Sequence, residues 1–215
     1  KDASLALDMM NTAKDSMVPP FEISVFPDPA GSFTTAAAMV ACTEKTLKDK
    51  FNTNLKDKNI IIYGGKGIVG GISAIMCAKE GSKCTIVGYD GITNVKKKAE
   101  EYKSRFGVDI IPADGTTDEL NSSYLPQADI IFCAARAGTQ VISEEQLKLA
   151  KNTKVLADVN AVPPAGLGGV NLKDDDAEHP CGGLSIGPLT SGDIKVKTQY
   201  SCLLYTSDAA DDGVG

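Results

Sequence analysis

The feature that most limits how this chain can fold is an apolar β-branched run that ends in a cluster of glycines. Residues 59–71 have the sequence N-I-I-I-Y-G-G-K-G-I-V-G-G, in which the glycines are spaced Gly65-x-Gly67-x-x-Gly70. A short run of isoleucines favours a buried strand, and glycines allow a tight turn from that strand into a helix. We therefore predict a strand, turn and helix here, with the first amides of the helix open at the turn.

Such a turn is suited to the pyrophosphate of a dinucleotide. The first glycine serves the tight turn, the second the approach of the phosphate, and the third the packing of helix against strand. A second β-branched run ends at Gly88-Tyr89-Asp90, and Asp90 follows Gly70 by about 20 residues, a usual separation for a carboxylate that binds the adenosine ribose. The alternative is a βαβ unit without a ligand, because 21 glycines produce such spacings by chance. The candidate cofactor residues are Gly65, Lys66, Gly67, Ile68, Val69, Gly70, Tyr89, Asp90, Ala134 and Ala135.

From residue 59 onward, strands and helices alternate regularly. This pattern predicts an α/β fold with a Rossmann-type, doubly wound parallel sheet, whose ligand crevice lies at the carboxyl ends of the strands. We expect strands at 59–63, 84–88, 108–111, 129–133 and 154–158, and helices near 68–80, 92–105, 117–123 and 143–151.

The preceding residues indicate part of a smaller N-terminal α/β substrate domain. Lys1 to Asp15 is expected to be a helix, Phe21 to Phe26 alternates like a half-buried strand, and a helix capped by Ser32 or Thr34 runs to about Phe51. We expect this remnant with its connecting helix at 1–50, the nucleotide-binding domain at 51–200, and a disordered or artefactual tail at 201–215.

Composition excludes several classes of protein. The net charge of -6 argues against a nucleic-acid surface, and the three lysines Lys96, Lys97 and Lys98 are expected on a solvated helix face. Six cysteines without a C-x-x-C pair indicate a reducing compartment, without a disulfide framework or a zinc site. No segment has the length of a membrane span. We therefore expect a cytoplasmic protein that binds neither nucleic acid nor membrane.

Polar side chains follow the last predicted strand. Asp158 and Asn160 begin a Pro- and Gly-rich loop at the mouth of the crevice, where polar groups commonly contact ligand, although both could instead cap turns. Thr34 and Thr35 open the helix that leads into the nucleotide domain, so substrate contact and simple capping are both open. His179, the only histidine, lies in an acidic stretch that we expect to be a solvated loop rather than a metal site.

Three segments together resemble the NAD(P)-dependent methylene-tetrahydromethanopterin dehydrogenases of one-carbon metabolism. They are D-P-A-G-S-F-T-T-A-A-A at 28–38, G-K-G-I-V-G at 65–70 and A-D-V-N-A-V-P-P-A-G-L-G-G-V at 157–170. The resemblance implies an oxidoreductase that moves a hydride from the methylene group of methylene-tetrahydromethanopterin, or of methylene-tetrahydrofolate, to NAD(P)+. It also implies a homo-oligomer and a pterin in the cleft between two domains.

The same resemblance assigns roles to the candidate site residues. Ser32, Thr34 and Thr35 would line the pterin side of the cleft, and Asp158 and Asn160 would face the reacting ring or the nicotinamide. We add the hypothesis that Asp158 stabilises the developing cation. Relatives that prefer NADP carry a basic residue where this chain has Tyr89-Asp90, so NAD is favoured and NADP is possible.

Two further interpretations stay open. The chain could be another Rossmann dehydrogenase, similar to shikimate dehydrogenase, or it could be a non-catalytic NAD-binding module. The segment from about Ser201 resembles a translated sequencing adapter, so no function is inferred from it.

Overall fold

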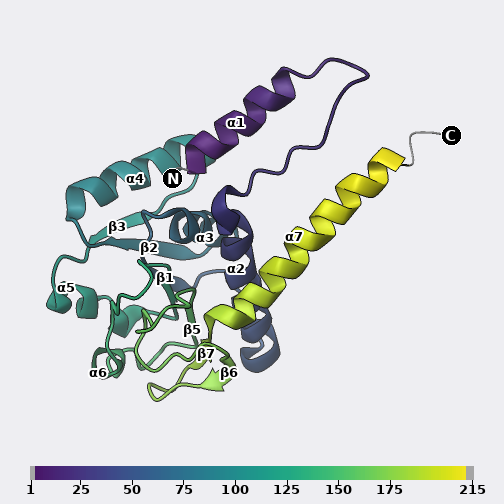
Figure 1. Ribbon diagram of the computed structural model, residues 1–215. Helices are drawn as coiled ribbons and strands as arrows, with labels where there is room; N and C mark the ends of the chain where they lie inside the picture. Colours follow the sequence, from purple (N-terminus) through teal and green to yellow (C-terminus); the bar gives the residue numbers. More distant parts are fainter. Residues whose placement is uncertain (1–2, 212–215) are drawn as a thin grey trace.

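A seven-stranded sheet, in the order β3-β2-β1-β4-β5-β7-β6, forms the centre of the computed structural model, which describes residues 3–211 (Figure 1). All neighbouring strands run parallel except β6, which pairs antiparallel with β7. The strands are β1 Asn59–Tyr63, β2 Lys83–Gly88, β3 Ile111–Asp114, β4 Ile130–Cys133, β5 Val155–Asp158, β6 Asp175–Glu178 and β7 Leu184–Ile186.

Helices cover both faces of this sheet, as a doubly wound fold requires. In β1, Ile60 and Ile62 pack against the layer formed by α2, α3 and α4, whereas Ile61 and Tyr63 pack against the opposite layer, which includes α6. Burial on both faces explains why the strands read as continuous apolar runs. The helices are α1 Ala3–Asp15, α2 Ser32–Phe51, α3 Ile68–Lys79, α4 Ile92–Phe106, α5 Asp118–Ser123, α6 Glu144–Leu147 and α7 Pro188–Asp211, with short 3-10 helices at Pro29–Gly31 and Leu125–Gln127.

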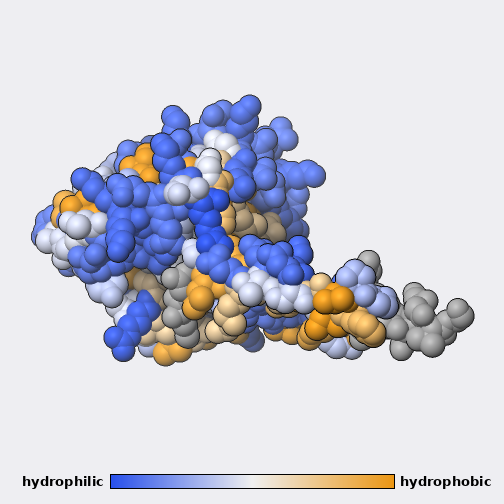
Figure 2. All heavy atoms as spheres, turned by 90° about the horizontal axis from the view of Figure 1, so that it is seen from above, coloured by the Kyte–Doolittle hydropathy of each residue, from blue (hydrophilic) through white to orange (hydrophobic). Residues whose placement is uncertain are grey.

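The first and last helices lie on the outside of this core. Helix α1 lies beside α4, where Asp8 forms an ion pair with Arg105 at 2.6 Å (Figure 1). Helix α7 leaves the end of β7, passes the start of α2 and projects away from the sheet. Figure 2 shows hydrophobic side chains on this projecting helix, where Val196 is 60% exposed and Leu203 is 61% exposed.

Both edges of the sheet have irregular features. Edge strand β3 contains Pro112, which has no backbone N–H to donate. The other edge strand, β6, is interrupted by a bulge between Asp175 and Ala177, and Asp176 within it has a φ of 55°.

The sequence-based expectations hold for the doubly wound sheet, for strands β1, β2, β4 and β5, and for helices α2, α3 and α4. The third strand was placed wrongly at 108–111. Val108 and Ile110 are buried, but pairing with β2 begins only at Ile111, opposite Thr85. The helix expected at 143–151 covers only Glu144–Leu147.

The strand expected at Phe21 to Phe26 is not formed. Residues 21–28 have no regular secondary structure, because no strand among residues 3–211 lies alongside to pair with them, and Phe21 is 80% exposed. The described part of residues 1–50 therefore consists of helices joined by an irregular segment, without the expected strand.

The C-terminal region also differs from the expectation. Strand β6 was missed because its residues, D-D-A-E, lack any apolar alternation, and β7 is only three residues long. The segment expected to be disordered from Ser201 continues helix α7 as far as Asp211, and the remaining four expected tail residues lie outside the described part of the chain.

Candidate dinucleotide-binding site

The glycine turn between β1 and α3 has the geometry expected from its spacing. The amide of Gly67 donates to the carbonyl of Gly64 at 2.9 Å, and α3 begins at Ile68 without a side-chain cap. A Cβ on Gly70 would lie 2.6 Å from the Gly64 oxygen, and a Cβ on Gly67 would lie 3.2 Å from it. The turn therefore leaves the first amides of α3 free of a side-chain cap, and any side chain at Gly70 would displace its backbone.

A cavity of about 410 Å³ opens beside this turn, at the carboxyl ends of β1, β2 and β4. Its walls include five of the candidate cofactor residues, namely Lys66, Gly67, Tyr89, Ala134 and Ala135. Of the other five candidates, Gly65, Ile68, Val69 and Gly70 belong to the turn and the first turn of α3, and Asp90 contacts Lys66 of the cavity wall. This is the position at which an open parallel sheet binds its ligand, so the structure brings the predicted cofactor residues to one edge.

Several wall residues were missed in the sequence. Arg136 and Thr139 come from the loop after β4, and Gly115 and Asn121 follow β3. The strand-end sequence A-A-R-A-G would have indicated Arg136, because it follows a predicted strand directly. Asn121 gave no such signal, since it reaches the cavity from α5 and donates to the Gly115 carbonyl at 3.3 Å.

Asp90, the expected ribose ligand, has a cationic neighbour. Its carboxylate forms an ion pair with Lys66 of the glycine turn and accepts a hydrogen bond from Asn94 Nδ2 at 3.0 Å. The hydrogen bond from Lys66 holds the pKa of Asp90 below its usual range. Lys66 Nζ also lies 5.4 Å from the centroid of the Tyr89 ring, so lysine, carboxylate and aromatic ring form one cluster at the end of β2.

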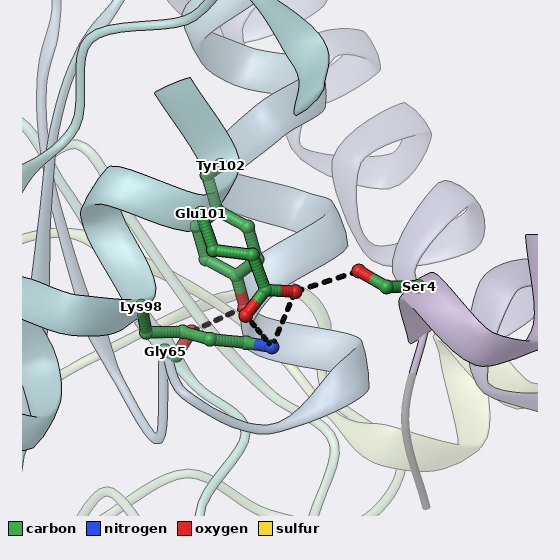
Figure 3. A network of polar contacts seen from close by, with 5 residues as sticks. All are labelled: Ser4, Gly65, Lys98, Glu101 and Tyr102. Atoms are coloured by element: carbon green, nitrogen blue, oxygen red, sulfur yellow. Dashed lines mark hydrogen bonds and ion pairs between the residues drawn. The ribbon is translucent and has the colours of Figure 1, made fainter. Parts of the chain in front are cut away.

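Helix α4 contacts the glycine turn through a tyrosine (Figure 3). The buried Tyr102 hydroxyl donates to the Gly65 carbonyl at 3.3 Å. Beside it, Lys98 pairs with Glu101, whose carboxylate also accepts from Ser4 of α1 at 2.6 Å. This network connects α1, α4 and the turn. Within it Lys98, one of the three lysines expected on a solvated face, forms an ion pair with Glu101.

Asp158 does not face the cavity. Its side chain is 0% exposed, and its oxygens accept from the amides of Asn160 at 2.8 Å and Leu167 at 2.9 Å. Burial raises the pKa of this carboxyl, although the amide hydrogen bonds oppose the shift. In this structure Asp158 holds the 158–167 loop through these hydrogen bonds, and the expectation that it faces the reacting ring or the nicotinamide stays a prediction.

Asn160 connects the loop after β4 to the loop after β5. Its Oδ1 accepts from the amides of Gly138 at 3.2 Å and Val162 at 3.0 Å, and its Nδ2 donates to the Pro164 carbonyl at 2.9 Å. The side chain is 5% exposed. Of the two interpretations drawn from the sequence, the structure favours backbone capping for this residue.

The start of α2 is capped from outside the helix, neither by Ser32 nor by Thr34. Asp28 accepts from the amides of Phe33 at 2.8 Å and Thr34 at 3.2 Å, and from the Thr34 hydroxyl at 2.6 Å. Thr35 donates its hydroxyl to the Gly31 carbonyl at 2.7 Å, whereas Ser32 is half-buried at the first helical position. The expected caps are wrong because the carboxylate of Asp28, five and six residues before the two amides, accepts their hydrogen bonds.

Asp28 also connects this cap to α7. Its Oδ2 accepts from Gln199 Nε2 at 2.7 Å. Burial alone would raise the pKa of Asp28, but the hydrogen bonds from Thr34, Gln199 and the helix amides hold that pKa below its usual range.

His179 is not in a solvated loop as expected. It is 4% exposed, with Nε2 lying 2.8 Å from the Gly168 carbonyl and Nδ1 accepting from the Cys181 amide at 3.2 Å. A carbonyl only accepts, so Nε2 carries the proton. The imidazole therefore joins the β6–β7 turn to the loop that follows β5.

Among the described side chains, no three or more histidines, cysteines or carboxylates form a cluster that could hold a metal ion. Between residues 3 and 211, no helix combines the length and the apolar character that a membrane crossing would need.

Comparison with solved structures supports the fold class. The structure is similar to a transhydrogenase from Sinorhizobium meliloti, with a TM-score of 0.59 and 14% identity, over 84% of this chain and 53% of that one. It is also similar to a shikimate 5-dehydrogenase from Listeria monocytogenes, solved with shikimate and NAD, with a TM-score of 0.52 and 16% identity, over 90% of this chain and 75% of that one. Sheet order, glycine turn and these likenesses define a Rossmann-type dinucleotide-binding fold.

Sequence comparison identifies the family. The chain is 46% identical, over 93% of its length, to the NAD(P)-dependent methylenetetrahydromethanopterin dehydrogenase of Methylorubrum extorquens strain AM1, and it covers 67% of that protein. The bifunctional protein MdtA of the same organism is 28% identical over 89% of the chain, which covers 65% of it. No protein-family model matches. The chain belongs to the NAD(P)-dependent methylenetetrahydromethanopterin dehydrogenase family, and so to the oxidoreductases of one-carbon metabolism, and it spans about two thirds of the length of these relatives.

Proposed function

We propose that this protein takes a hydride from the methylene group of methylene-tetrahydromethanopterin and forms the methenyl product. The observation that carries the proposal is the glycine turn, with the open amides of α3 beside a cavity of about 410 Å³, in a chain 46% identical to a dehydrogenase of that name. Methylene-tetrahydrofolate is the alternative carrier.

The reaction suits a site without a general base. The methylene C–H bond breaks with both electrons leaving as hydride, and the remaining cation is delocalised over two nitrogens, so no proton is transferred. When bound, NAD(P)+ supplies the hydride acceptor. The protein's contribution is therefore to position the pterin ring against the nicotinamide ring and to exclude water.

The chain's own residues divide between these tasks. We assign pyrophosphate binding to the turn Gly65 to Gly70 and the adenosine end to Tyr89, Asp90, Ala134 and Ala135. On the pterin side, we propose contact by Ser32 and Thr35 at the start of α2, with Thr34 fixing that start through Asp28. Asp158 and Asn160 would hold the loop that covers the reacting centre, and the charge of Asp158 would act on the cation only at longer range.

NAD is the cofactor that we favour. A carboxylate at Asp90 accepts hydrogen bonds from the ribose hydroxyls and repels a 2′-phosphate, and this supports NAD over NADP. The cationic partner of Asp90 reduces that repulsion, so NADP remains a possible second cofactor.

Localisation and assembly belong to the same proposal. Six free thiols support a reducing compartment, and we propose the cytoplasm. The exposed apolar residues along α7, with Val196 60% exposed and Tyr200 64% exposed, support a homo-oligomer, because contiguous apolar surface commonly marks a protein interface.

The proposal is tested by following the absorbance of reduced nicotinamide. The full chain is incubated with NAD+ or NADP+ and with methylene-tetrahydromethanopterin, methylene-tetrahydrofolate or shikimate, and dinucleotide binding is measured in parallel by calorimetry. We expect turnover with the methanopterin derivative. Turnover with shikimate alone would favour the shikimate-dehydrogenase interpretation. Binding heat without turnover of any substrate would indicate a non-catalytic module, and the absence of heat would remove the proposal.

A further inference from the structure

Lys66 occupies an unusual position between the glycine turn and the end of β2. Its aliphatic stem passes over Gly88, so that a Cβ on that glycine would lie 3.5 Å from both Cδ and Cε of the lysine. The ammonium then reaches the Asp90 carboxylate and lies 5.4 Å from the Tyr89 ring centroid. The residue therefore extends from the proposed pyrophosphate turn toward the proposed ribose position.

The ion pair between Lys66 and Asp90 is open to solvent and easily exchanged. The two side chains are 22% and 32% exposed, and ion pairs with this much access to water add little to stability. Asp90 keeps a second partner, because Asn94 Nδ2 donates to the same oxygen at 3.0 Å. Separation of Lys66 from Asp90 therefore does not leave the carboxylate without a hydrogen bond.

Other cations are less suited to this position. Lys98 is paired with Glu101 at 2.8 Å, while Lys96 and Lys97 are exposed on α4. Arg136 lines the cavity from the loop after β4. Among the described side chains, Lys66 combines a place in the cavity wall with an ion pair to Asp90.

We infer that Lys66 is a movable counter-ion that sets cofactor specificity and allows one site to accept either a 2′-hydroxyl or a 2′-phosphate. With NAD, Lys66 stays on Asp90, and the carboxylate accepts the hydrogen bond of the ribose hydroxyl. With NADP, the ammonium leaves Asp90 for the phosphate, and Asn94 retains the carboxylate. This inference rests on the proposed function, because it assumes that the adenosine ribose lies at the end of β2.

Binding of NAD+ and NADP+ to the full chain tests the inference without any pterin. Calorimetry is run on the wild type, Lys66→Met, Lys66→Arg and Lys97→Met. We expect Lys66→Met to weaken NADP+ binding by about tenfold to a hundredfold, as for loss of a charged hydrogen bond, and NAD+ binding by less than about threefold. Lys66→Arg keeps the charge and should retain NADP+ binding. Lys97→Met, a matched change at an exposed lysine, should leave the NADP+ to NAD+ affinity ratio as in the wild type.

The outcomes separate this inference from the proposed function. Equal weakening of both cofactors in Lys66→Met would mean that Lys66 contacts the shared pyrophosphate, which overturns the specificity role. A changed ratio in Lys97→Met with none in Lys66→Met would transfer that role to α4. If wild-type protein binds neither dinucleotide, the proposed function itself fails. Thermal unfolding of each variant shows whether a loss of binding comes from misfolding.

Discussion

At the scale of single residues, the glycines of the β1–α3 turn show how a missing side chain becomes a binding feature. Gly70 is surrounded by backbone, so an added methyl has no flexible neighbour to displace. We expect Gly70→Ala to shift the turn and to weaken dinucleotide binding by at least about tenfold. Gly192→Ala is the matched control, because nothing lies within 4 Å of a Cβ there. Calorimetry that finds equal affinity in Gly70→Ala and wild type would contradict the assigned role of the turn.

Asp158 shows the limit of residue-level inference from sequence. A carboxylate directly after a parallel strand is commonly at the ligand, yet here the loop folds back and covers it with amides. Asp158→Asn would place an amide group against the amides of Asn160 and Leu167, so we expect a loss of about 1–3 kcal/mol in the free energy of unfolding. Urea denaturation measures this loss. Unchanged stability with a lower kcat would instead favour the electrostatic role.

At the scale of elements, the sequence predicted the strands and helices that have a strong hydrophobic or glycine pattern. Strands β1, β2, β4 and β5 carry apolar runs that are buried on both faces, and glycines mark the turn into α3. The predicted position of β3 was three residues too early, because Val108 and Ile110 are already buried although hydrogen-bonded pairing with β2 begins only at Ile111. The links made by Asp28, His179 and Lys66 could not be predicted, since each joins residues that come together only after the chain has folded.

The cap at the start of α2 gives a pH prediction. The pKa of Asp28 is lower in the folded chain than its unfolded value of about 3.9, so its stabilising contribution is present above that pH and is lost as the pH falls through the folded pKa. Asp28→Asn removes the titrating group. We expect its melting temperature to decline less steeply than that of the wild type below about pH 4. Identical pH profiles would show that the cap does not contribute to acid stability.

At the scale of the whole molecule, α7 is the element most suited to contact another copy. Val196 of this helix is 60% exposed. We expect Val196→Asp to shift the protein toward the monomer in light scattering after size exclusion, because a charge would be buried in the interface. Lys79→Asp, on the surface of α3, is the control. A wild-type chain that is monomeric at all concentrations would remove the proposed homo-oligomer.

The two borders of the sheet limit how copies of this protein can associate. Pro112 removes a donor from one border, and the bulge with Asp175 and Asp176 bends the other and places carboxylates along it. Neither edge strand is therefore well suited to pair with a strand of a second molecule. These features favour ordered assembly through helical surfaces and give partially unfolded chains less opportunity to join into extended β-structure.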